Sequence, residues 1–96
     1  MSYNLDERVE SEIIELAKKY NIEKVILFGS RARGDNRERS DIDLAVSGGD
    51  ILNFTFDVDE KVWTLLSFDV VNLDRGISEE LQTEINRDGK MIYEKV

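Results

Sequence analysis

The sequence contains no cysteine, no histidine and no proline among its 96 residues. Without cysteine there is no disulfide bond, no thiol nucleophile and no cysteine-ligated zinc site. Without histidine, a general base must be a carboxylate, a lysine or a tyrosine. Any metal ion must then rely on oxygen ligands, which suit magnesium, manganese or calcium.

Long apolar runs are also missing, and no window holds 18 consecutive apolar residues, so we expect no membrane-spanning segment. Residues 1–13 lack a basic stretch followed by an apolar one, which argues against a signal peptide and favours a cytoplasmic protein. With no repeat, linker or low-complexity tract, residues 1–96 are expected to form one domain.

Positive charge is scarce: 13 Lys and Arg stand against 21 Asp and Glu, a net charge of −8. This balance argues against direct nucleic-acid binding through a broad basic face. A local basic pocket is still available, because four arginines lie within nine residues: Arg31, Arg33, Arg37 and Arg39.

The hydrophobic pattern predicts alternating helices and strands. Helices are expected at 5–21, somewhere within 50–66 and at 78–89, a helical turn at 31–35, strands at 24–28, 41–46 and 67–73, and an edge strand or tail at 91–96. Asn4 is the expected cap of the first helix, with Glu7 three residues later. The stripe of the second helix comprises Ile51, Phe54, Val58, Val62 and Leu65. The order predicts an α/β (α+β) domain with a small sheet of three to four strands.

Asp41 and Asp43 are the strongest chemical feature of the chain. Residues i and i+2 of a strand share a face, so the two carboxylates should lie side by side, opposite the apolar Ile42, Leu44 and Val46. Like charges at that distance repel each other, and a divalent cation would relieve the repulsion. A solvated acidic strand end is the alternative, since an Asp-x-Asp pair alone is common.

A possible phosphate site precedes this pair. Gly29 would let a phosphate approach the backbone, Ser30 could donate a hydrogen bond, and Arg31 or Arg33 could neutralise charge. The stretch is not a P-loop, because Asp35 stands where that motif requires lysine. An EF-hand is excluded too, because Ala45 and Val46 replace the required ligand and glycine. Arg37 and Arg39 fit a solvated loop equally well.

These residues together resemble the signature of the polymerase-β-like nucleotidyltransferase superfamily: Gly29-Ser30, ten residues, then Asp41-x-Asp43. "LFGSRARG", "SDIDLAV" and "EINRDGKMIYE" are similar to its minimal branch, the MNT proteins, over nearly the whole chain. The resemblance implies a nucleotidyltransferase fold with a third carboxylate on a neighbouring strand. Asp69 in "SFDVV" is the expected residue, and its rivals are Asp57, Asp59 and Asp74.

The resemblance also implies a mechanism. Asp41, Asp43 and Asp69 would hold two Mg²⁺ ions about 3.5–4 Å apart, which would stabilise the attacking and leaving oxygens. Gly29 and Ser30 would hold the β- and γ-phosphates of ATP. Asp69 would also help to take the proton from the acceptor hydroxyl, and pyrophosphate would leave.

The partner is implied by the same resemblance. Minimal MNT proteins typically pair with HEPN ribonuclease toxins, and some transfer AMP from ATP to a toxin tyrosine. The leading interpretation is therefore an adenylyltransferase antitoxin, and the alternative is a non-catalytic module that neutralises the toxin by contact. Phe54, Phe56 and Trp63 are either core residues or the surplus apolar surface of a homodimer or a HEPN-binding face.

Overall fold

The computed structural model describes residues 3–96. Its helices are α1 (Glu7–Lys19), α2 (Gly29–Arg33), α3 (Ile51–Lys61) and α4 (Glu79–Asp88). Its strands are β1 (Lys24–Phe28), β2 (Ile42–Ser47), β3 (Phe68–Asn72) and β4 (Lys90–Glu94), and a 3₁₀ turn, η1, spans Leu73–Arg75. The predicted class and strand count are confirmed, and the C-terminal segment forms an edge strand.

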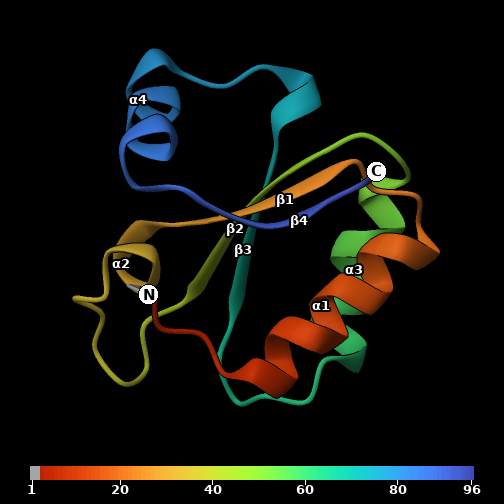
Figure 1. Ribbon diagram of the computed structural model, residues 1–96, viewed down its shortest axis with the longest axis horizontal. Coiled ribbons are helices and arrows are strands. Elements are labelled where there is room, and N and C mark those ends of the chain that lie inside the picture. Colours follow the sequence, from red (N-terminus) through yellow and green to blue (C-terminus); the bar gives the residue numbers. More distant parts are fainter. Residues whose placement is uncertain (1–2) are drawn as a thin grey trace.

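The four strands form one mixed sheet in the order β3-β2-β1-β4. β1 runs antiparallel to both β2 and β4, whereas β2 and β3 are parallel because α3 carries the chain back between them. Figure 1 shows α1 and α3 together on one side of the sheet and α4 on the other. The C-terminal end of β1 therefore meets the N-terminal ends of β2 and β3 at one edge of the molecule.

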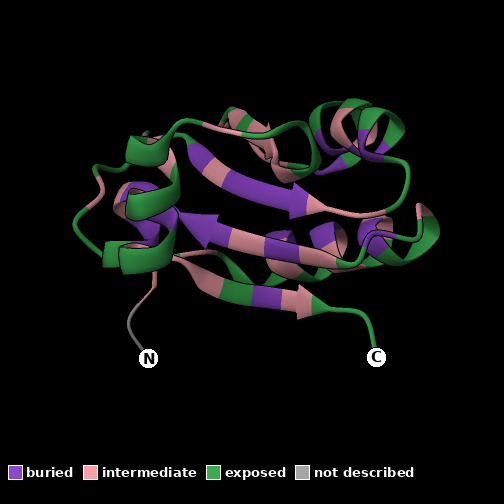
Figure 2. Cartoon of the chain, turned by 90° about the horizontal axis from the view of Figure 1, so that it is seen from above, coloured by how far each residue is buried: buried purple, intermediate pink, exposed green. Residues whose placement is uncertain are grey.

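The main core fills the side of the sheet that α1 and α3 cover. Inward-facing side chains of α1, β1, β2 and α3 are completely buried there, among them Ile13, Leu27, Leu44, Phe54 and Val58. In Figure 2 the buried colour is concentrated on the central strands and on the inner faces of these helices. Such burial of apolar surface is the main driving force for folding a domain of this size.

The opposite side of the sheet carries a much smaller apolar cluster. Its buried members are Phe28, Ala45 and Ile85, which half-buried side chains of β1, β3 and α4 surround. α4 starts at the predicted cap Ser78, whose hydroxyl accepts a hydrogen bond from the Leu81 N–H. Only part of this sheet face is covered, and the rest is free for polar groups.

Two predictions about local structure were wrong, and one short element was not predicted. The cap of α1 is Asp6, which accepts from the N–H groups of Arg8 and Val9, whereas the Asn4 side chain bonds to Asn36 instead. Leu65 is fully exposed, because α3 ends at Lys61 and the chain continues in an extended conformation. The turn η1 had no predicted counterpart.

No helix within residues 3–96 combines the length and the apolar content needed to cross a membrane.

Candidate active site

Three chain segments meet at the end of the sheet where the acidic residues lie. In the strand register, Asp43 stands beside Phe28 of β1 on one side and beside Asp69 of β3 on the other. Asp43 lies on the same face of the sheet as Ala45, two residues later, and Asp69 lies on the same face as Val71. Ala45 and Val71 belong to the small cluster under α4. Both carboxylates therefore occupy the face opposite the main core, in which Ile42, Leu44 and Val46 of β2 are completely buried. Strand alternation predicted this face for Asp43 but made no prediction for Asp69.

Asp43 is the aspartate of this group whose pKa is clearly raised. Its pKa is raised from 3.8 to about 6, chiefly by partial burial and then by the negative charges of Asp69, Asp41 and Glu84, while Arg33 acts in the opposite direction. Three other carboxylates thus lie close enough to act on Asp43, with one guanidinium nearby. Glu84, on α4, was not among the predicted site residues.

Gly29 is packed directly against Asp43. Its φ is +75°, and a Cβ placed on it would lie 2.3 Å from the Asp43 Oδ2 atom. A side chain at this position would displace the Asp43 carboxylate, and only glycine adopts this backbone conformation without cost. The glycine therefore makes room for the carboxylate, a reason that the sequence did not indicate.

The carboxylates are neighbours without forming a ready metal site. Asp41 precedes β2 and is exposed, as is Asp69, whereas Asp43 is half-buried. Among residues 3–96, no three acidic side chains are arranged to hold a metal ion. Their donor atoms are all oxygens, the ligand type that Mg²⁺ prefers.

The rival aspartates lie elsewhere. Asp57 on α3 accepts the Tyr20 hydroxyl hydrogen bond and pairs with two lysines of the main-core side. Asp74 accepts a hydrogen bond from the Gly48 N–H beyond the other end of β2. Asp59 is exposed on α3. None of the three is beside the Asp43 carboxylate in the sheet.

Arg31 has a different position from the one predicted. Its side chain is buried, with 6% exposure. Its Nε donates to the Ser40 carbonyl at 3.0 Å and its Nη2 to the Glu38 carbonyl at 3.0 Å. The guanidinium thus fixes the loop that leads into Asp41. The structure gives no support to Arg31 as a phosphate ligand, because its donors already serve this loop.

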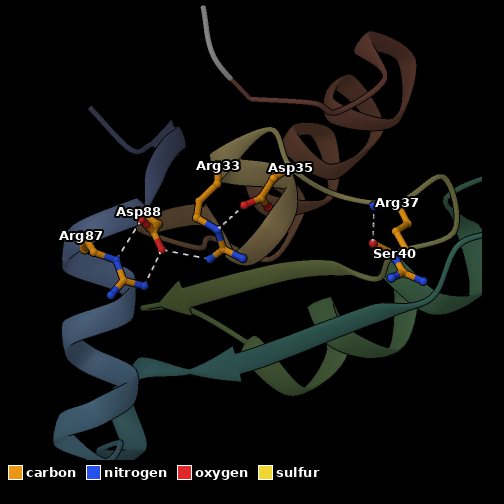
Figure 3. A network of polar contacts seen from close by, with 6 residues as sticks. All are labelled: Arg33, Asp35, Arg37, Ser40, Arg87 and Asp88. Atoms are coloured by element: carbon orange, nitrogen blue, oxygen red, sulfur yellow. Dashed lines mark hydrogen bonds and ion pairs between the residues drawn. The ribbon is translucent and has the colours of Figure 1, made fainter.

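Arg33 belongs to α2, like Arg31, but its side chain bonds to Asp88 on α4. Its Nε donates to Asp35 Oδ2 and its Nη1 to Asp88 Oδ2, each at 3.1 Å. Arg87 donates to both oxygens of Asp88, at 3.1 and 2.8 Å. Figure 3 shows Asp88 between the two arginines. Arg87 and Asp88 were missed as site residues, although the phrase "EINRDGK" that contains them was noticed.

A shallow groove of about 360 Å³ lies next to Asp41. It is bounded by the loop before β2 and the loop before β3, and its lining residues are Glu38, Arg39, Asp41, Leu65, Leu66 and Ser67. The groove joins an acidic residue of the site to the fully exposed Leu65. Large apolar side chains that are also exposed between β2 and β3 are Leu52, Phe56 and Trp63, so Phe54 is the member of the three aromatics that lies in the core.

The chain is similar to known proteins in sequence and in fold. Residues 11–96 match the family model described as polymerase beta, nucleotidyltransferase. A candidate protein adenylyltransferase from Methanocaldococcus jannaschii is 39% identical over 70 residues, which make up 71% of this chain and 68% of the relative.

Solved structures give the same picture. A toxin–antitoxin structure with AMP-PNP is similar at 27% identity and a TM-score of 0.70, covering 90% of this chain and 73% of the matched chain. A complex of a tri-AMPylated Shewanella oneidensis HEPN toxin with an MNT antitoxin matches at 25% identity and a TM-score of 0.63, covering 91% and 71%. A minimal nucleotidyltransferase matches at 26% and 0.64, covering 84% and 86%.

Proposed function

Since the chain belongs to the polymerase beta nucleotidyltransferase family, we propose that it transfers AMP from ATP to a tyrosine hydroxyl of a HEPN-type toxin and thereby acts as the antitoxin. The observation that carries the proposal is the row formed by Asp43 and Asp69, with Asp41 nearby and Gly29 directly against Asp43. The adenylyltransferase and toxin–antitoxin relatives support the choice of substrate and partner.

Magnesium fits this donor set. The crowded negative charge around Asp43 needs a counter-charge, and the available ligands are carboxylate oxygens. Mg²⁺ commonly binds through one or two carboxylates together with substrate phosphates, which is consistent with carboxylates that are not yet gathered around an ion. Asp41, Asp43 and Asp69 would hold the metal, which would stabilise charge on the attacking and leaving oxygens.

The protein's own residues would orient the reactants. Gly29 and Ser30 begin α2, so their N–H groups have no partner inside that helix and can donate to the β- and γ-phosphates. Arg33 would contribute a positive charge there. Asp69 would accept the proton of the acceptor hydroxyl as its oxygen bonds to the α-phosphorus. The bond from that phosphorus to the bridging oxygen breaks, and pyrophosphate leaves.

The acceptor would approach through the groove beside Asp41. This groove opens between two loops, and the exposed Leu65 borders it. A tyrosine of a partner protein could lie against such an edge with its hydroxyl toward the carboxylates, since tyrosine has an apolar ring and a polar tip. Phe56 and Trp63 are further exposed apolar groups of the kind that protein partners cover.

The test supplies α-labelled ATP, Mg²⁺ and a HEPN-type toxin as the acceptor. We expect label on the partner, and a loss of about a thousandfold in Asp43→Asn, the scale of losing a preorganised catalytic group. Asp59→Asn is the matched control, because it removes an equivalent charge from an exposed site on α3. Toxin neutralisation that continues without label, and is unchanged in Asp43→Asn, would instead establish the non-catalytic binding module.

A further inference from the structure

Arg33 is held by two carboxylates that differ sharply in exposure. The Asp88 side chain is 9% exposed, whereas the Asp35 side chain is 63% exposed. In Figure 3 they approach the guanidinium from different sides, Asp88 from α4 and Asp35 from the residue pair that follows α2. One partner is therefore enclosed by the fold, and the other is open to exchange with solvent or with a ligand.

Asp88 is unusually well satisfied. Its Oδ1 accepts from Arg87 Nε, and its Oδ2 accepts from Arg87 Nη2 and from Arg33 Nη1. These guanidinium bonds, first those of Arg87, lower its pKa to about 2. Helix stability does not explain the residue, since a carboxylate in the last turn of a helix opposes the helix dipole. The two arginines do explain it.

The turn after Asp88 keeps this carboxylate in place. A Cβ on Gly89 would lie 2.4 Å from the Ile85 carbonyl oxygen and 2.7 Å from the Ile26 side chain. Glycine thus allows α4 to end tightly against β1, and α2 continues directly from β1. The spacing between Asp88 and Arg33 is consequently set by the backbone of the sheet and not by a flexible loop.

Arg33 is positioned toward the acidic row and the Gly29–Ser30 turn. It belongs to the same helix as that turn, and its charge reaches Asp43. Within residues 3–96, its Nη2 makes no hydrogen bond, because Asp35 takes Nε and Asp88 takes Nη1. A phosphate oxygen could occupy Nη2 and replace Asp35 at Nε in a two-point contact while Asp88 stays bound.

We propose that Asp88 is a positioning residue that holds Arg33 for the phosphates of the nucleotide, and that Asp35 is a placeholder which those phosphates displace. The proposal rests on the nucleotide-binding function proposed above. It predicts that neutralising Asp88 and neutralising Asp35 change nucleotide affinity in opposite directions. Without the Asp88 carboxylate, the Arg33 guanidinium is no longer held in one position. Without the Asp35 carboxylate, the phosphates have no competitor for the Arg33 Nε.

The experiment measures the Kd of the whole chain for ATP with Mg²⁺ by titration calorimetry, with melting temperatures recorded beside it. We expect Asp88→Asn to weaken binding about fivefold, and Asp35→Asn to tighten it about two- to threefold, as suits an exposed ion pair. Glu80→Gln is the control, because it removes an exposed charge from the first turn of the same helix.

A double-mutant cycle with Arg33→Gln separates positioning from general structural support. In that background, neither Asp88→Asn nor Asp35→Asn should change the Kd further. An unchanged Kd in Asp88→Asn, an equal loss in the Arg33→Gln background, or weaker binding in Asp35→Asn would overturn the proposal. If the wild-type chain binds no ATP, the proposed function itself fails and the positioning role fails with it. Asp35 is exposed, so its variant tests the idea even if Asp88→Asn folds poorly.

Discussion

The two faces of the sheet differ in how much apolar surface they bury and in how much charge they carry. The face under α1 and α3 is continuous and apolar, and most of its side chains are completely buried. The face under α4 holds three buried residues, and beside them a row of carboxylates with a raised Asp43 pKa. The same two central strands serve both faces, because alternate residues point to opposite sides.

This difference separates what stabilises the domain from what gives it chemistry. The burial and the charge crowding around Asp43 oppose folding when that carboxylate is ionised, since both raise its pKa. Such a cluster is typical of a functional site, where stability is commonly lower than the fold would allow. Substitutions on the two faces should therefore differ in whether they change stability or catalysis more.

The largest effect is expected from truncation of the main core. Ile13→Ala should lower the free energy of unfolding by about 4 kcal/mol, and Ile85→Ala by about 2 kcal/mol, both within the range for such truncations. Ile13 is completely enclosed, whereas Ile85 has half-buried neighbours that can move into the space. Urea denaturation of both variants measures the difference. Equal losses would show that the two clusters support the fold equally.

The next largest effect is expected at Gly29, directly after β1, where one substitution should change both stability and catalysis. Gly29→Ala should reduce AMP transfer about a hundredfold and cost about 2 kcal/mol of stability, because its Cβ would strike Asp43 in a backbone region that alanine avoids. Transfer rates and urea midpoints report the two effects. Gly76→Ala is a useful control, because that glycine also has a positive φ but nothing within 4 Å of its Cβ position. It should lose stability and keep its transfer rate.

The smallest effect is a gain. Asp43→Asn should stabilise the metal-free protein at pH 7.5 by about 1–2 kcal/mol, a value reduced from the full pKa difference because Asp43 is only half-buried. The pKa of Asp43 in the folded protein is raised from 3.8 to about 6, so the wild-type free energy of unfolding falls as the pH rises through that interval and Asp43 ionises. Below pH 4 the two proteins should be nearly equal. Unfolding curves from pH 3.5 to 8 check this, and a constant difference across the range would contradict it.

The sequence predicted much of the fold because its signals were local. β1 was assigned with the observed bounds from one apolar run closed by a glycine, and α4 from Ser78 and Gly89. The position of Asp43 opposite the buried Leu44 followed from strand alternation, whereas Asp41 lies just before β2, outside the strand in which the alternation was predicted. Asp69 came from the family resemblance, and its register beside Asp43 agrees with that expectation.

Other features depended on contacts between distant segments. The Arg31 side chain serves the loop before β2 because the fold encloses it there, and nothing in its local sequence indicates burial. The bond between Arg33 and Asp88 joins residues 55 positions apart. Leu65 continued a helical stripe, but the helix ended four residues earlier. Patterns describe one segment at a time, and these features arise where two segments meet.

If the function proposed above is correct, the acidic row around Asp43 binds a magnesium–nucleotide complex. Thermal unfolding of the wild type and of Asp43→Asn, with and without Mg²⁺ and a non-hydrolysable ATP analogue at tenfold its Kd for the wild type, tests it most directly. We predict that the wild-type melting temperature rises by about 5 °C or more, as ligand linkage requires for a domain of this size, and that Asp43→Asn shows almost no rise. Equal rises in both proteins, or none in the wild type, would contradict the claim.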